Sequence, residues 1–97
     1  MMYEEYALLF KVLSDPNRLK IIELLISGET CSCTLIDKLP ITQPTLSYHL
    51  KIITSSGLAT SRKEGTWMKY FINKDKLSFL SKFIVNLKNT EVTECSL

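Results

Sequence analysis

The sequence has little of several features that mark common protein classes. No stretch approaches the roughly 20 consecutive apolar residues that a membrane-spanning helix needs. The N-terminus MMYEEY has glutamates where a signal peptide carries lysines. The three cysteines are an odd number, and two of them are one residue apart, unlike the disulfide framework of a secreted protein. These absences predict no membrane partner and a place in the reducing cytoplasm.

Groups suited to catalysis are equally scarce. His49 is the only histidine, so one chain cannot supply a histidine-rich metal site. No paired acid and base, nucleotide-binding loop or catalytic triad can be recognised. The chain also has no repeats, low-complexity tracts or linkers, and its 97 residues are enough for one small domain. An enzyme is therefore the least favoured class.

What the sequence does have is an uneven distribution of charge. Residues 1–41 carry four bases and six acids (net −2), residues 42–76 carry six bases and two acids (net +4), and residues 77–97 are balanced. Positive charge is thus concentrated in one segment, as a surface facing nucleic-acid phosphates requires. A solvated basic face without a partner is the commoner cause of such a pattern, so charge alone is weak evidence.

The first part of the chain predicts three helices. An apolar stripe at helical spacing covers residues 3–13. Asp15 and Pro16 suit the N-cap and the first position of a second helix, which ends at Gly28. A short third helix is expected over about residues 31–38. The side chains of the second helix that we expect to face the core are Leu19, Ile22, Leu25 and Ile26.

The second part predicts two helices separated by a β-hairpin. Thr42 is expected to cap a fourth helix, which ends at Gly57. Two runs of β-forming residues follow, with Glu64-Gly65 as the turn between them. Asp75 is then expected to cap a last helix over about residues 76–89.

This order of elements predicts the fold class. Helix, short helix, tight turn, helix and hairpin make a mainly α fold, a winged helix-turn-helix with five helices and a two-stranded wing. Large apolar side chains near both ends indicate a partner subunit, although a fuller core of its own is the alternative. Residues 1–89 are expected to form one domain for DNA binding and dimerisation, and residues 90–97 a flexible tail.

The fourth helix separates an apolar face from a polar one. Leu46, Leu50 and Ile53 cluster on one side of the helical wheel. The other side has hydroxyls, a phenol and an ammonium group, which can donate to base edges or phosphates in a major groove. Gln43 flanks the apolar side but lies in the first turn, where recognition helices touch bases. The expected DNA contacts of this helix are Gln43, Pro44, Thr45, Ser47, Tyr48 and Lys51.

The residues next to this face are interpreted separately. His49 lies at the edge of the apolar stripe, which favours packing over base reading. Trp67 is expected to pack at the base of the wing, because duplex DNA offers no splayed base to stack on. Strand alternation places Arg62 and Lys63 on opposite faces of the hairpin, so only some wing cations can reach one phosphate or minor-groove site. The expected wing contacts are Arg62, Lys63 and Lys69.

Three segments carry a resemblance to a known family. They are LSDPNRLKIIELL (13–25), ETCSCTL (29–35) and TQPTLSYHLKIITSSGLATSRKEGTWMKYFI (42–72). Together they resemble the ArsR/SmtB family of metal-responsive winged helix-turn-helix repressors, over about residues 5–75. The resemblance implies a homodimer joined through the first and last helices. It also implies binding to a double-stranded operator with an inverted repeat, with no cofactor required, and release when an inducer binds.

Cys31-Ser32-Cys33 opens the short third helix. Two thiols one residue apart are not a zinc-finger spacing, and no second pair completes four ligands. One interpretation is structural, with one thiol buried as a small apolar group. The other is a soft-ion site, because a helix N-terminus favours the thiolate. Side chains two residues apart on a helix point about 200° apart. Chelation is therefore expected to distort this helix, which we expect to pack on the recognition helix.

Within the family, the pattern resembles the arsenite-responsive (ArsR) type of site, which usually has a third thiol. Ile36 stands where some members have that cysteine, and Thr34 where an aspartate is common. Cys95, in the tail, is then the remaining candidate for a third ligand beside Cys31 and Cys33, and it could equally be incidental. The resemblance implies As(III) or Sb(III) as inducer, with Cd, Zn or Bi as alternatives. The family's second zinc site is not supported, since residues 76–89 have no histidine and no acid.

Two other functions remain open. The same cysteines could respond to oxidation, forming a disulfide or a sulfenic acid in an otherwise similar repressor. A protein-binding winged helix that does not touch DNA would instead have acids or apolar groups on the outer face of residues 43–52. Ser47, Tyr48 and Lys51 disfavour that second alternative.

Overall fold

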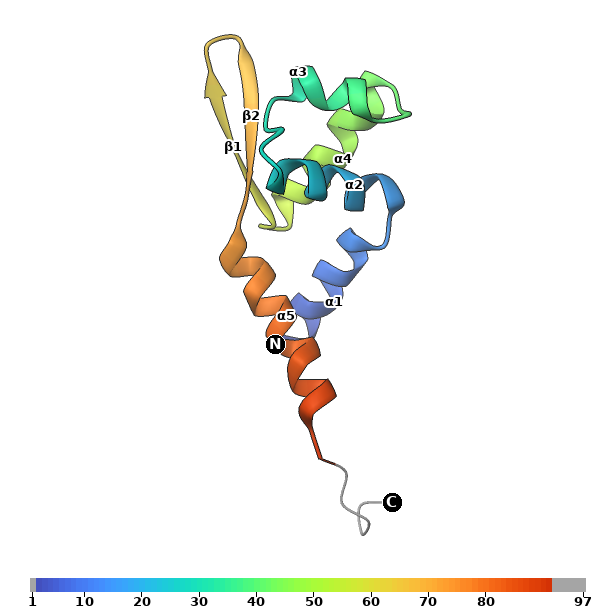
Figure 1. The fold of residues 1–97 in the computed structure, drawn as a ribbon, viewed down its shortest axis with the longest axis vertical. Coiled ribbons are helices and arrows are strands. Elements are labelled where there is room, and N and C mark those ends of the chain that lie inside the picture. Colours follow the sequence, from blue (N-terminus) through green and yellow to red (C-terminus); the bar gives the residue numbers. More distant parts are fainter. Residues whose placement is uncertain (1, 92–97) are drawn as a thin grey trace.

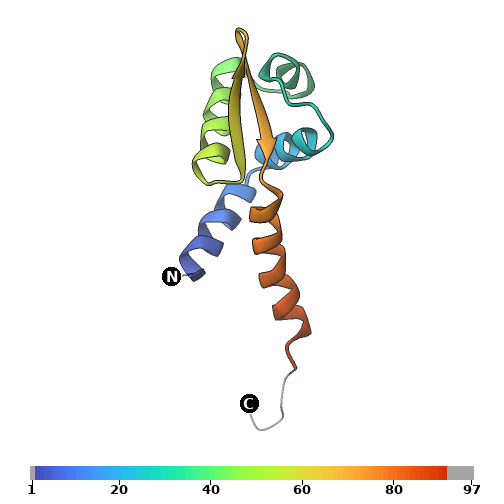
Figure 2. The same ribbon diagram turned by 90° about the vertical axis from the view of Figure 1, so that its left-hand side faces the viewer.

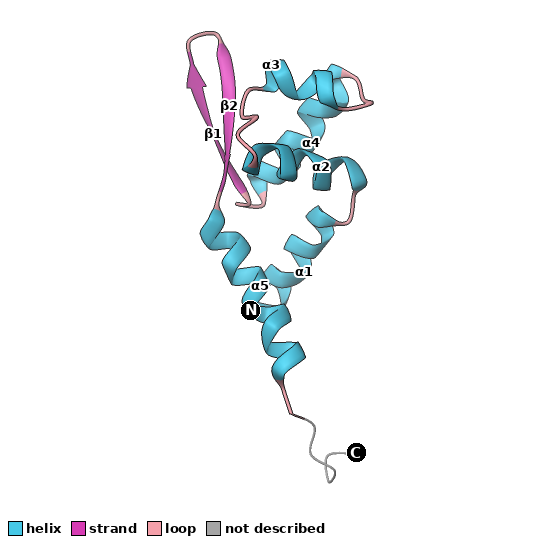
Figure 3. Ribbon diagram, in the orientation of Figure 1, coloured by secondary structure: helices cyan, strands magenta, loops and turns pink. Residues whose placement is uncertain are grey.

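The computed structural model describes residues 2–91 and has the predicted fold class (Figure 1). The hairpin stands beside the three middle α-helices, and the first and last helices extend away from them (Figure 3). The elements in chain order are α1 (Met2–Leu13), α2 (Pro16–Ile26), α3 (Ser32–Leu35), the 3₁₀ helix η1 (Ile36–Lys38), α4 (Gln43–Ser55), β1 (Ala59–Glu64), β2 (Trp67–Ile72) and α5 (Lys74–Asn89).

Side-chain caps fix where the helices begin. Asp15 accepts hydrogen bonds from the backbone N–H groups of Asn17 (2.8 Å) and Arg18 (3.1 Å), which confirms the predicted cap of α2. Desolvation opposes ionisation of this carboxyl, but the two N–H groups and the nearby charges outweigh it and lower the pKa of Asp15 below its usual value. At α5 the cap is Asn73, whose side chain accepts from the N–H of Lys76. The prediction that Asp75 caps α5 is therefore wrong, because a capping residue precedes it.

The wing is a two-residue hairpin. Arg62 pairs with Lys69 and Glu64 with Trp67, which leaves Gly65 and Thr66 as the loop. Gly65 has a φ of +65°, a conformation that glycine adopts without steric cost. The sequence prediction of Glu64-Gly65 places the turn one residue too early, because the positive φ lies at the first loop position rather than at the second.

The core lies between α2, α4 and the base of the wing. Ile21 of α2 is fully buried, with Ile22 and Leu25 beside it. Leu19 and Ile26, which were predicted to face inward, are 51% and 53% exposed. That prediction is wrong because α2 is apolar on most sides, so its periodicity does not single out one face. The remaining core residues are Leu9, Val12, Leu35, Leu39, Leu46, Leu50, Ile53, Leu58, Ala59 and Leu80.

Helices α1 and α5 pack through aromatic rings. Tyr6 stacks against Phe79 and Phe83, with ring centroids 4.7 and 4.2 Å apart, and Phe10 lies 6.2 Å from Phe83. Leu80 is the one buried residue of α5. Helix α5 projects away from the hairpin and the central helices (Figure 2). None of the helices described over residues 2–91 is long and apolar enough to cross a membrane.

Helices α1 and α5 also carry large apolar side chains that remain exposed in this protomer. The exposed ones are Met2, Tyr3, Leu8, Phe10, Ile84, Val85 and Leu87.

Candidate nucleic-acid interface and cysteine pair

Helix α4 has one buried face and one open face. Leu46, Leu50 and Ile53 are at most 2% exposed, so the predicted core side of this helix is confirmed. Thr42 directly precedes the helix as predicted, but its hydroxyl donates to the Thr45 hydroxyl (3.0 Å) instead of capping the backbone. Five of the six predicted DNA contacts on this helix are exposed, and Thr45 is half-buried. The exposed residues are Gln43, Pro44, Ser47, Tyr48 and Lys51.

The wing cations do not form one positive patch. Glu64 accepts a hydrogen bond from Nε of Arg62 (2.8 Å) and forms an ion pair with Nζ of Lys69 (3.3 Å). Hydrogen bonds from Arg62 and Lys69 lower the pKa of Glu64, so this carboxylate stays ionised between them. Lys63 lies on the other face of the hairpin, opposite Met68, and has no ion pair within residues 2–91. Sequence reasoning missed Glu64 because its role depends on the cross-strand register.

Trp67 lies at the tip of the wing rather than at its base. It is the first residue of β2, directly after the two-residue turn, and 54% of it is exposed. The prediction that it packs at the base is wrong, because the register places it as far from the core as the hairpin reaches.

His49 is buried, as the packing interpretation predicted. It is 5% exposed and faces α2 instead of the open side of α4.

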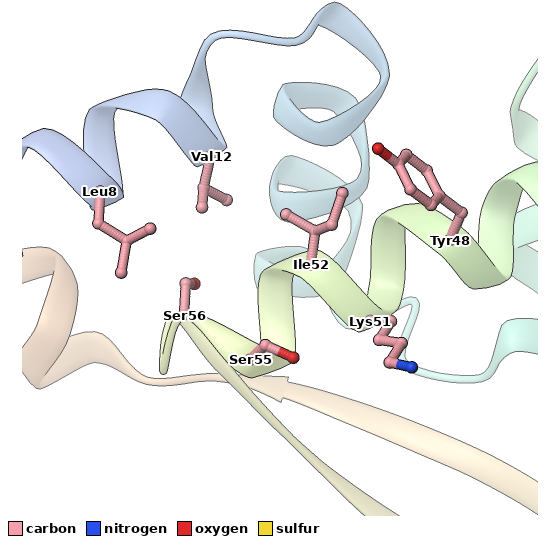
Figure 4. A pocket seen from close by; sticks show the side chains of 7 residues that line it. All are labelled: Leu8, Val12, Tyr48, Lys51, Ile52, Ser55 and Ser56. Atoms are coloured by element: carbon pink, nitrogen blue, oxygen red, sulfur yellow. The ribbon is translucent and has the colours of Figure 1, made fainter.

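An apolar groove separates α1 from α4 (Figure 4). Leu8 and Val12 of α1 face Tyr48 and Ile52 of α4 across a space of about 480 Å³, with Lys51 at its edge. Sequence reasoning missed this groove, because it depends on the angle between two helices that are far apart in the chain.

The two cysteines of the CxC segment lie together. Cys31 is the N-cap of α3, with extended backbone (φ −85°, ψ 132°), and Cys33 lies in the first turn. Their Cα atoms are 5.1 Å apart and their sulfurs are joined in a disulfide. The expectation that the side chains point about 200° apart is therefore wrong, because Cys31 is not helical. Both sulfurs can meet without any unwinding of α3.

The cysteine pair is connected to the wing through the backbone. The N–H of Tyr70 donates to the carbonyl of Thr30 (2.9 Å), and Cys31 forms an antiparallel bridge with Lys69 of β2. Helix α3 packs more closely on β2 than on α4. The second wing strand is thus a neighbour of this helix that the sequence did not indicate, and Leu35 of α3 also belongs to the core cluster that contains Leu46 and Leu50 of α4.

Over residues 2–91 the structure does not supply a third ligand near the pair. Among residues 2–91, no cluster of three or more histidine, cysteine, aspartate or glutamate side chains could hold a metal ion. The predicted third ligand, Cys95, lies outside the described residues.

Comparison with known proteins gives consistent results. The sequence profile of the arsR family of bacterial regulatory proteins matches residues 15–61. The arsenical resistance operon repressor of Staphylococcus xylosus is 38% identical over 96 residues, which cover 99% of this chain and 91% of that protein. The cadmium resistance transcriptional regulatory protein of Listeria innocua is 38% identical over 80 residues, covering 81% and 67%.

A solved structure extends the comparison to the fold. The homodimeric winged helix-turn-helix DNA-binding domain of a possible ArsR-family regulator from Mycobacterium bovis superimposes with a TM-score of 0.73 at 26% identity. The match covers 96% of this chain and 91% of that one. These relatives are transcriptional regulators, not enzymes. The chain belongs to the arsR family and is a winged helix-turn-helix transcriptional repressor.

Proposed function

We propose that this repressor reads an inverted-repeat operator as a homodimer, with α4 in the major groove and the wing beside it. The observation that carries the proposal is the open face of α4, where Ser47, Tyr48 and Lys51 are exposed opposite a fully buried apolar face. The helix has no acid that would repel phosphates. We infer a location in the cytoplasm, since the repressor would need access to its operator DNA.

The dimer would form through α1 and α5. These two helices carry the uncovered apolar side chains, including Leu8, Ile84 and Leu87, at 49–62% exposure. Burying such groups against a second copy removes them from water and adds to a core that is thin for a chain of this length. The homodimeric state of the mycobacterial structure supports this arrangement.

The inducer would be As(III) or Sb(III), bound by Cys31 and Cys33 in their reduced form. In this reaction each thiol gives its proton to a hydroxyl of arsenous acid, the hydroxyl leaves as water, and an As–S bond replaces it. The support is the convergence of the two sulfurs, together with the arsenical resistance repressors among the relatives. Cadmium is the alternative ion, in view of the cadmium resistance regulator. Cys95 is the candidate third ligand.

Ion binding would reach the DNA through the wing. Cys31 supplies a backbone bridge to Lys69, and its neighbour Thr30 accepts from the N–H of Tyr70. A new bond at the sulfur of Cys31 therefore acts on the residue that holds α3 and β2 together. A tenfold loss of DNA affinity needs only about 1.4 kcal/mol of coupling between the two sites. Hydrogen exchange of the Tyr70 amide should accelerate when arsenite is added.

A second candidate trigger is oxidation of the same pair. It is favoured by the disulfide between Cys31 and Cys33, since a two-electron oxidant would join these thiols without any ion. Titration of the DNA-bound protein with arsenite, antimonite, cadmium, zinc and peroxide, followed by fluorescence anisotropy, separates the two triggers. Release by arsenite in the presence of a reductant supports the ion. Release by peroxide, with no release by arsenite, would show that oxidation and not ion binding is the trigger.

A further inference from the structure

We propose that Arg18 and His49 are positioning residues for DNA recognition, which hold the recognition helix α4 at a fixed place relative to α1. The inference rests on the proposed function, in which α4 reads DNA and α1 joins the two subunits. Neither side chain belongs to the predicted DNA contacts, and Arg18 has no assigned role.

The Arg18 side chain connects three helices. It leaves the first turn of α2, and its Nε donates to the carbonyl of Val12 (2.7 Å) at the end of α1. Nη2 lies 3.5 Å from the carbonyl of Lys11, and Nη1 donates to Nδ1 of the buried His49 (3.1 Å) on α4. Carbonyls in the last turn of a helix have no partner within the helix, and a cation there is favourable. The guanidinium fork therefore suits this place in a way that a lysine does not.

The donor pattern fixes the state of His49. A guanidinium group has only donors, so Nδ1 of the imidazole must accept and the ring proton lies on Nε2. Nε2 points toward the Asp15 carboxylate, 4.0 Å away, which also caps α2. The other charged residues near the site are Arg18 itself and Lys11, which lines the adjoining hollow and whose backbone carbonyl accepts from Arg18. His49 is thus oriented at Nδ1 by Arg18, with the Asp15 carboxylate near the other side of its ring.

Apolar contact between α1 and α4 is incomplete at this place. Leu8 and Val12 face Tyr48 and Ile52 across the groove of about 480 Å³ (Figure 4). Arg18 lines an adjoining hollow of about 270 Å³ between the same two helices. The hydrogen-bonded bridge therefore crosses the gap where side-chain contact is incomplete. Without it, we expect the position of α4 relative to α1 to be less strictly fixed.

Such a shift matters more for an operator than for DNA in general. The two recognition helices of a dimer must enter half-sites about one helical turn apart. If α1 joins the subunits, the distance between the two recognition helices depends on how Arg18 and His49 connect α1 to α4. The same displacement occurs in both subunits, so its effect on this distance is doubled. Binding to phosphates alone does not depend on that spacing.

The test uses a duplex that the wild-type protein selects from a random library, and an unrelated duplex of equal length. Arg18→Met keeps the alkyl stem but removes the fork, and His49→Leu removes the acceptor. His49→Asn places an amide oxygen near the position of Nδ1. Lys20→Met is the matched control, because it removes an exposed charge of the same sign from the same helix. Circular dichroism identifies a temperature at which each variant is folded.

We expect Arg18→Met and His49→Leu to weaken binding to the selected duplex about tenfold. Binding to the unrelated duplex should change no more than with Lys20→Met, and His49→Asn should restore most of the affinity lost in His49→Leu. Equal losses on both duplexes, or equal losses in the two His49 variants, would overturn the positioning role alone. If Arg18→Met does not fold, the comparison of His49→Leu with His49→Asn on the selected duplex still tests the positioning role. Selection of no sequence by the wild-type protein would instead remove the proposed function, and this role with it.

Discussion

Replacement of Glu64 by glutamine should strengthen DNA binding and make it more sensitive to salt. Glu64 lies between Arg62 and Lys69 on one face of the wing, within 2.8 Å of Nε of the former and 3.3 Å of Nζ of the latter. Its carboxylate neutralises two cations that we expect to face DNA. The neutral amide should release both cations for contacts with phosphate oxygens.

The size of the effect follows from counterion release. Each additional phosphate contact steepens the slope of log K against log salt by about 0.9. One released cation therefore increases the loss of affinity between 50 and 200 mM salt by about 3.5-fold, and two released cations by about 12-fold. The assay is anisotropy of a labelled duplex at four or more salt concentrations.

Glu23→Gln is the matched control, because Glu23 is also paired with one lysine but lies on the exposed side of α2. We expect this control to leave the slope unchanged. An unchanged slope in Glu64→Gln would show that neither Arg62 nor Lys69 reaches a phosphate. A loss of affinity would show that the ion pairs of Glu64 shape the wing for DNA.

Other changes test separate parts of the account. Lys51→Ala should lower DNA affinity and flatten the salt slope by about 0.9, and an unchanged slope would remove Lys51 from the interface. Ile84→Asp should shift the protein to monomers in sedimentation velocity, because it places a charge in the apolar face of α5; an intact dimer would locate the interface elsewhere. Asp15→Ala should lower the free energy of unfolding by about 1 kcal/mol at pH 7. The folded-state pKa of Asp15 is depressed, so this stabilisation is present above about pH 4 and is lost as the pH falls further. Urea unfolding of both proteins should therefore converge at low pH, and a constant difference would contradict the cap.

The parts of the fold that depend on local chemistry could be predicted from the sequence. Asp15 followed by Pro16 identifies the start of α2, and Leu46, Leu50 and Ile53 identify the buried face of α4, because each signal lies within one turn or one helix. The open side of the recognition helix follows from the same periodicity. Gly65 identified the wing turn to within one residue.

The features that sequence reasoning missed depend on contacts between distant segments. The pairing of Glu64 with Lys69 and the position of Trp67 follow from the strand register. The convergence of Cys31 and Cys33 depends on where α3 begins, since a shift of one residue would place both on the helix. The bridge from Arg18 to α4 spans 31 residues of sequence, and no local pattern marks it.

The central claim is that the cysteine pair controls DNA affinity. Its most direct test is the change in the DNA dissociation constant when arsenite is added to the reduced wild-type protein and to Cys33→Ser. We expect at least a tenfold weakening for the wild-type protein, equal DNA binding by both proteins without arsenite, and no response of Cys33→Ser. An equal arsenite response in the two proteins would contradict it.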